Sequence, residues 1–263
     1  MTPLLALIRK EITVLFASPV AYLVLTTVAL ITALVFFEHL RLYNQILFLY
    51  ATTTMGGFES DTIPDYVNLR DTVFFPVMEQ LGLLLIVPIP LVTMRVFAEE
   101  RARGTDEILV TSGLSTDQIV LAKFSVTFGF VALMMMVSFL YPVTAVAQGG
   151  LGLQHLLAVF LGLLLLSIGI ASIGLACSAF TTSQIIAAAA TVAITFVLYD
   201  FGWTHAFATA GAAAVLDAIS LHPHFGRFSE GIVQLSDIVY FVGLAFVGGA
   251  IARTSLELRR VRG

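Results

Sequence analysis

The chain has 263 residues, of which 59% are hydrophobic and 11% are charged, and its mean hydropathy is +0.98. A soluble domain carries about a quarter charged residues, so this composition excludes that class and favours a membrane protein. The net charge of -4 gives no sign of a nucleic-acid partner, and the single cysteine, Cys177, excludes an internal disulfide and a multi-cysteine metal site.

The first segment, residues 1–17, mixes apolar and charged residues at helical spacing, which suits a helix lying in the membrane interface. Long apolar runs follow it, and a transmembrane helix needs roughly 20 such residues. The sequence therefore predicts an all-α polytopic fold with a single transmembrane domain over residues 1–263. Its six spans are expected at about 19–37, 81–97, 119–141, 156–176, 185–199 and 238–251.

Two polar stretches separate some of these spans, at about 38–80 and 200–236, and Pro88 and Pro90 predict a kink in the second span. Six spans place both termini on one side of the membrane. Lys and Arg gather on that side, which the positive-inside rule makes cytoplasmic, so we expect a bacterial inner-membrane protein with both termini in the cytoplasm. The residues on that side are Arg9, Lys10, Arg95, Arg101, Arg103, Lys123, Arg253, Arg259, Arg260 and Arg262, against Arg41, Arg70 and Arg227 on the other.

The stretch "FAEERARGTDE", from Phe97 to Glu107, concentrates charge in the first cytoplasmic loop, residues 95–118. Glu99 and Arg103 are four residues apart and can pair on a helix. Gly104 then breaks the helix, and Thr105 can cap a short amphipathic helix that follows. Such a helix, held between two spans, is a site that a cytoplasmic protein can bind.

The loop resembles that of ABC type-2 exporter permeases, in the stretch "FAEERARGTDEILVTSGLSTDQIVLAKF". The family pattern is roughly E-x-x-x-G-T-x-E-x-L-x-T-x-P-x-S, and the usual proline is replaced near Gly113 and Leu114. Two more stretches, "IRKEITVLFASPVAYLVL" and "HPHFGRFSEGIVQLSDIVYF", are similar to the gliding-motility-type branch of the family. The loop positions that match are Glu100, Gly104, Thr105, Glu107, Leu109, Thr111 and Ser115.

The resemblance implies a permease subunit driven by a separate ATPase, which binds the ATP and Mg²⁺. This chain has no G-x-x-x-x-G-K-[ST] phosphate loop, so we expect it to be no enzyme and to hold no cofactor. The resemblance further implies a second permease copy or paralogue and a membrane partner with an external domain. It makes residues 104–112 the ATPase-coupling segment, supported by Glu99, Glu100, Arg101 and Glu107.

Two other functions stay open. An ion-driven secondary transporter would need paired charges inside the membrane, and the spans offer almost none. A scaffold that transmits force from the ATPase to an external partner, without transport, shares every sequence feature named above. A measured substrate flux separates that scaffold from an exporter.

A few residues outside the loop are candidates for a pathway or a site. Glu79 lies at the start of the second span, where we favour a solvated membrane edge over a pathway position. Phe225 and Phe228, in the amphipathic external stretch, are candidates for a gate. The small residues of "GIASIGLACSA", 169–179, favour close packing of helices within the chain, and a dimer contact is the alternative.

Two motifs with catalytic or metal chemistry are less specific. His222-Pro223-His224 offers two metal ligands without a third, which favours simple loop polarity. Tyr199-Asp200 resembles half of an intramembrane aspartyl protease site, but such a site needs two carboxylates that share a proton. No second acid lies in a facing predicted span, so we expect no catalysis there.

Overall fold

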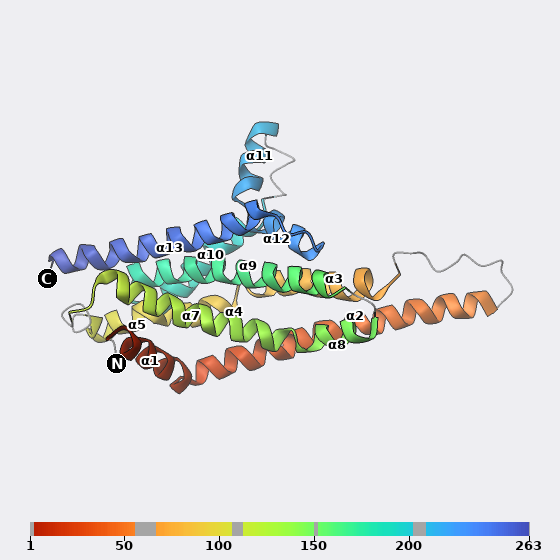
Figure 1. The fold of residues 1–263 in the computed structure, drawn as a ribbon, viewed down its shortest axis with the longest axis horizontal. Coiled ribbons are helices and arrows are strands. Elements are labelled where there is room, and N and C mark those ends of the chain that lie inside the picture. Colours follow the sequence, from red (N-terminus) through yellow and green to blue (C-terminus); the bar gives the residue numbers. More distant parts are fainter. Residues whose placement is uncertain (1–2, 56–66, 107–112, 150–151, 202–208, 263) are drawn as a thin grey trace.

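The computed structural model describes residues 3–55, 67–106, 113–149, 152–201 and 209–262. Every regular element within these residues is a helix, and the helices form one elongated bundle (Figure 1). Both termini lie at the same end of the bundle, beside the end of α5 (Arg95–Arg103) and the start of α7 (Thr116–Ser138). The charge distribution had predicted that the two termini and this loop lie on the same side.

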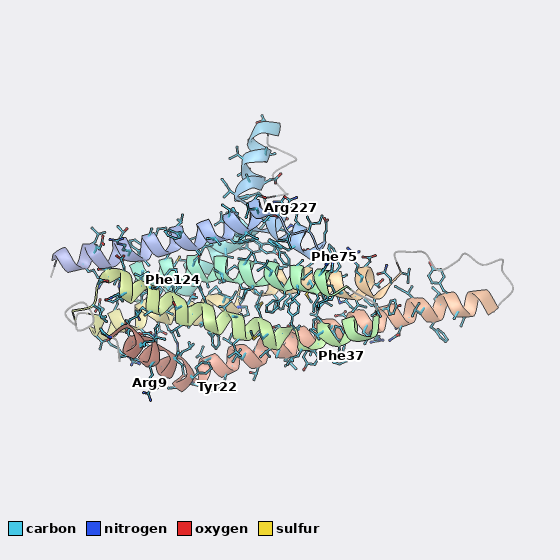
Figure 2. The ribbon with its side chains drawn as sticks, viewed as in Figure 1. Arg9, Tyr22, Phe37, Phe75, Phe124 and Arg227 are labelled. Carbon is cyan, nitrogen blue, oxygen red and sulfur yellow. The ribbon has the colours of Figure 1, made fainter. Side chains whose placement is uncertain are left out.

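The N-terminal helix α1 (Pro3–Ala17) packs against α7 and turns at Ser18 into α2 (Pro19–Met55). Arg9 on α1 and Tyr22 on α2 lie on the outer surface of the bundle (Figure 2). The helix α2 does not stop near residue 37, as the sequence suggested, because no glycine or proline interrupts it before Gly56. Its 37 residues span roughly 55 Å, longer than a bilayer core, so its second half extends beyond the bundle.

The second expected span is a series of helical pieces: the π-helical turn η1 (Arg70–Phe74), α3 (Phe75–Leu84), α4 (Pro88–Thr93) and α5. The chain is a turn at residues 85–87. Pro88 and Pro90 have no N–H to donate to the carbonyls four residues earlier, so the predicted kink is confirmed and has that cause. Helical structure also begins at Arg70, about ten residues before the expected start of the span.

The core of the bundle is α9 (Leu153–Phe180), which contacts α4, α5, α7, α10 (Gln184–Tyr199) and α13 (Leu235–Arg262). Its small residues allow that closeness. A Cβ added to Gly174 would lie 2.1 Å from Thr93 Oγ1, so α4 crosses α9 at the glycine. On the other side, a Cβ on Gly248 of α13 would lie 2.7 Å from the Ser172 carbonyl oxygen. The packing of small residues within the chain is thereby confirmed.

Within the described residues, five helical segments are long and apolar enough to cross a membrane: 19–52, 70–103, 116–138, 153–180 and 235–259. The apolar helix α10 has only 16 residues, so six spans remain a prediction. At the end opposite the termini, α8 (Leu140–Gly149) follows α7, and the stretch 200–236 contains α11 (Ala210–Ile219) and α12 (Leu221–Ser229). The helix α11 projects away from the bundle (Figure 1).

Candidate functional site

The charged stretch forms α5 and then ends on a glycine, as the sequence predicts. Gly104 has φ +68°, a left-handed conformation that glycine adopts without steric cost. The Thr105 N–H donates to the Glu100 carbonyl at 3.0 Å and the Gly104 N–H donates to the Arg101 carbonyl at 3.2 Å. These two bonds form a Schellman cap, which satisfies the last carbonyls of α5 and fixes the direction of the loop.

Side-chain hydrogen bonds are made at both ends of the loop. Ser115 and Gln118 have the S-x-x-Q spacing of a capping box and form one at the start of α7, with Ser115 Oγ accepting from the Gln118 N–H at 3.2 Å. At the other end, the Thr105 hydroxyl donates to the Glu100 carbonyl at 3.3 Å. Residues 107–112 lie outside the described part of the chain. Glu107, Leu109, Thr111 and the short coupling helix therefore stay predictions.

A buried lysine joins the charged stretch to the rest of the bundle. Lys123 of α7 is 1% exposed, and its Nζ lies 2.8 Å from Glu100 Oε2 and 3.2 Å from Glu11 Oε1. The same ammonium donates to the Val96 carbonyl at 2.7 Å and lies over the Phe97 ring. Lys123 thus connects α1, α5 and α7, and its one positive charge is shared between two carboxylates.

Lys10 completes this ion network from the outer side. Its Nζ contacts both Glu100 and Glu11. Burial opposes the charge of Lys10, but the hydrogen bond to Glu100 and the negative charge of Glu11 outweigh burial and raise the pKa of Lys10. The carboxylate of Glu100 therefore contacts two lysines of other helices, and its role as a support of the coupling segment stays a prediction.

The other charged residues of α5 divide into an outer pair and an inner contact. Arg103 Nη2 donates to Glu99 Oε1 at 2.6 Å on the exposed side, which confirms the pair predicted from the spacing. Arg101 instead points inward and is 7% exposed. It donates to Ser255 Oγ at 2.9 Å, and Ser255 donates to the Ala179 carbonyl at 2.6 Å, so α5, α9 and α13 meet there.

Two features at the termini end of the bundle were not predicted from the sequence. Ser178 Oγ of α9 accepts from the N–H groups of Phe97 and Ala98, each at 3.1 Å, and donates to the Met94 carbonyl at 2.9 Å. The second missed feature is the ion network of Lys123, which the sequence had placed only among the basic residues of the cytoplasmic side. A lysine within an apolar run, five residues after Gln118, was the available signal, because such a residue needs a buried acid.

At the opposite end, the candidate residues form a second polar cluster. Glu79 accepts hydrogen bonds from Ser229 Oγ and, at 3.0 Å, from His222 Nε2. The hydrogen bond to Glu79 raises the pKa of His222, although burial opposes that effect. Asp237, 0% exposed, is held by Arg227 and by His224 Nδ1 at 2.7 Å.

The structure also shows what contacts the remaining residues singled out from the sequence, the two histidines and the two phenylalanines of α12. His222 and His224 face different acids, and no group of three metal-type side chains occurs among the described residues. Phe225 and Phe228 are fully buried, with Phe225 against Gly82 and Phe228 against Gly162. In this state they fill the core at the end of the bundle, and their role as a gate stays a prediction.

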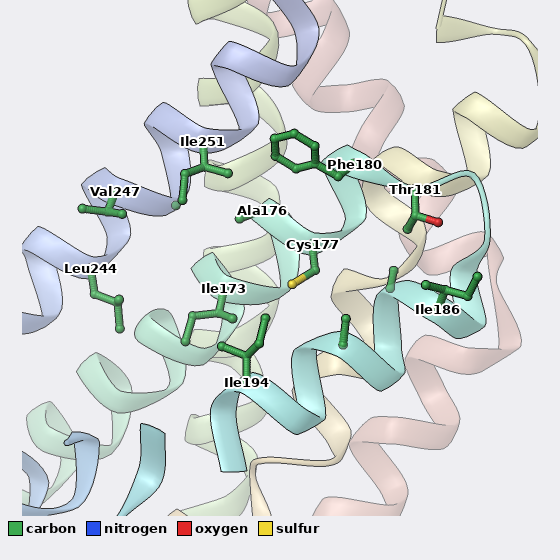
Figure 3. A pocket seen from close by; sticks show the side chains of 13 residues that line it. Ile173, Ala176, Cys177, Phe180, Thr181, Ile186, Ile194, Leu244, Val247 and Ile251 are labelled. Atoms are coloured by element: carbon green, nitrogen blue, oxygen red, sulfur yellow. The ribbon is translucent and has the colours of Figure 1, made fainter. Parts of the chain in front are cut away.

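An apolar groove of about 450 Å³ opens between α9, α10 and α13, near the termini (Figure 3). The sequence does not indicate this groove, because its wall comes from three separate helices. No charged side chain of the described residues lines the groove, so it is suited to apolar groups. Its lining includes Ile173, Cys177, Phe180, Ile186, Ile194 and Val247.

The fold and this site define a multi-pass helical membrane protein with a charged, internally connected end beside its first loop. The family model described as ABC-2 family transporter protein matches residues 58–202, just over half of the chain. The chain belongs to that family. No curated protein matches it.

Membership of the ABC-2 family identifies the type of protein. It is an ABC-2 permease subunit, and permeases of this family generally work with an ABC ATPase subunit that carries the catalytic activity. The matched residues include α5, the first loop and α7, so the charged stretch lies inside the family region.

Proposed function

We propose that this chain is the permease subunit of an ATP-driven exporter in a bacterial inner membrane, with both termini in the cytoplasm. The family match carries the proposal. Two permease chains, identical or paralogous, would enclose the substrate pathway, and two ATPase subunits would dock on the first loops. ATP binding would open the pathway outward by alternating access, and hydrolysis would reset it.

The contacts of α5 support the loop as the point where force enters the permease. The Schellman cap fixes the direction in which the chain leaves α5 at Gly104 and Thr105. Glu100 connects α5 to α1 and α7, while Arg101 connects it to α13. A push on residues 104–112 would therefore move α5 together with its neighbours.

The end opposite the loop favours a second candidate, a scaffold that transmits force without transporting a substrate. Here α11 projects from the bundle and exposes 59% of Val215 and 46% of Ile219. Apolar side chains on such a helix suit the membrane surface or a partner with an external domain. Substrate flux in vesicles that contain the complete complex distinguishes the two functions, since the scaffold gives ATP hydrolysis without flux.

The loop assignment is tested by co-purification with the ATPase. The double variant Glu107→Arg plus Leu109→Asp should lose the ATPase while it inserts into the membrane as well as the wild type. The matched control, Glu230→Arg plus Ile232→Asp, also replaces a glutamate by arginine and an aliphatic residue by aspartate, at the same spacing, on exposed residues of the other end. Normal ATPase binding by the loop variant would show that the coupling assignment is wrong.

A further inference from the structure

A cavity of about 290 Å³ lies between α1, the α4–α5 region and α7, next to the ion network. One part of its wall is charged, and the other part is apolar. The charged part includes Lys10, Arg95 and Lys123, and the apolar part includes Val14, Leu15 and Val92. A cavity with both kinds of wall, beside an interfacial helix, is shaped for an amphiphile rather than for a wholly apolar or wholly polar molecule.

The charges around this cavity do not balance. Four cations line it, Lys10, Arg95, Arg103 and Lys123, against three carboxylates, those of Glu11, Glu99 and Glu100. Each carboxylate already contacts a lysine or an arginine. Arg95 has no carboxylate within 4.0 Å among the described residues, so its positive charge is the surplus.

The guanidinium of Arg95 also has unused hydrogen-bonding capacity. Its Nη1 donates to Ser18 Oγ at 2.6 Å, whereas its Nε is buried and has no hydrogen-bond partner. Burying a donor without a partner costs its lost hydration, so native structures usually satisfy it. An arginine with a surplus charge and unused donors in a cavity is suited to an oxyanion.

We propose that this cavity binds the headgroup phosphate of an anionic phospholipid, with Arg95 as the phosphate ligand. The lipid comes from the leaflet on the side of the termini, because α1 and the end of α5 lie there. The valine and leucine side chains then contact the first part of an acyl chain. A single surplus cation matches a headgroup with one net negative charge, and the paired carboxylates disfavour more highly charged anions.

This site goes beyond the exporter function and does not depend on it. A lipid bound between α1 and α5 would add a second connection to the one that Lys10 and Glu100 already make. It would therefore stabilise the position of α1 whether or not the protein exports a substrate. Failure of the ATPase test leaves this site unaffected, and failure of the lipid test leaves the ATPase docking unaffected.

The experiment uses the full chain, purified in detergent and supplied with phosphatidylglycerol or phosphatidylcholine. Native mass spectrometry counts the lipids retained, and thermal unfolding measures their stabilising effect. The variant Arg95→Gln removes the surplus charge, and Val14→Trp fills the cavity mouth while Arg95 stays. Arg253→Gln is the control, since Arg253 lies at the same end, outside this cavity, and is paired with Asp117 and Glu257.

Wild type and Arg253→Gln should retain phosphatidylglycerol at least tenfold more than Arg95→Gln and Val14→Trp do. Phosphatidylcholine should be retained weakly by all four proteins. Equal retention of both lipids by the wild type would overturn the proposal, and so would full retention by Val14→Trp, which decides the matter even if Arg95→Gln fails to fold. Inorganic phosphate that stabilises the wild type as much as phosphatidylglycerol does would assign the site to free phosphate instead.

Discussion

Each end of the bundle has a charged side chain that is at most 1% exposed, Lys123 at one end and Asp237 at the other, and the two are neutralised in different ways. At the termini end, Lys123 contacts Glu11 and Glu100, which come from helices distant in the sequence. At the opposite end, Asp237 is held by His224 and Arg227, which precede it by 13 and 10 residues. The first network therefore joins separate helices, whereas the second mainly fixes the corner between α12 and α13.

The chemistry of the two ends differs as well. The ion network at the termini end consists of lysine, arginine and glutamate side chains. The opposite end includes two histidines, His222 and His224, in contact with acids. Contact with Glu79 raises the pKa of His222, so a response to pH near neutrality is expected at the opposite end.

The largest effect is expected at Lys123. The substitution Lys123→Met leaves the carboxylates of Glu11 and Glu100 with only Lys10, and breaking a buried ion pair in this way costs about 3–5 kcal/mol. Unfolding in mixed SDS micelles measures the loss. Lys10→Met is the matched control, because Lys10 contacts the same carboxylates but its side chain is 45% exposed. An equal cost for the two variants would remove the proposed distinction between a buried and a peripheral lysine.

A smaller, pH-dependent effect is expected at His222. Its pKa is raised in the folded protein by Glu79, so the stabilisation is complete below the unfolded value of 6.5 and is lost as pH rises through the raised pKa. The pair is partly exposed, so solvent screening limits the effect to below about 1 kcal/mol. Thermal unfolding of wild type from pH 6 to pH 8.5 should show this loss, and His222→Gln should not. His39→Gln, at the same end, should keep the wild-type slope; a similar slope in His222→Gln would refute the assignment.

The smallest effect is expected at the outer pair of α5. Glu99 and Arg103 lie on an exposed helical surface, where such a pair contributes about 0.2–0.5 kcal/mol. Arg103→Gln should therefore change the midpoint of unfolding only slightly, and 0.5 M salt should shift wild type toward the variant. A cost comparable with that of Lys123→Met would mean that Arg103 has a structural role beyond this pair.

Features that depend on neighbours in the sequence were predictable. The break at Gly104, the capping box at Ser115, the pair Glu99–Arg103 and the kink at Pro88 each rest on residues within four positions of one another. The length of α2 was not predicted, because polarity was taken as the end of a helix. The chain from 38 to 55 contains no glycine or proline, so it stays helical beyond the bundle.

Contacts between distant segments could not be predicted from the sequence. The charges of Glu100 and Arg101 were visible side by side, yet Glu100 binds two lysines of other helices and Arg101 turns inward to Ser255. The sequence alone determined that the chain is an all-helical membrane protein with its charge gathered at one loop, because hydropathy, spacing and caps are local properties. Only the tertiary structure decided which charge is buried against which, since that depends on how α9 brings α5, α7 and α13 together.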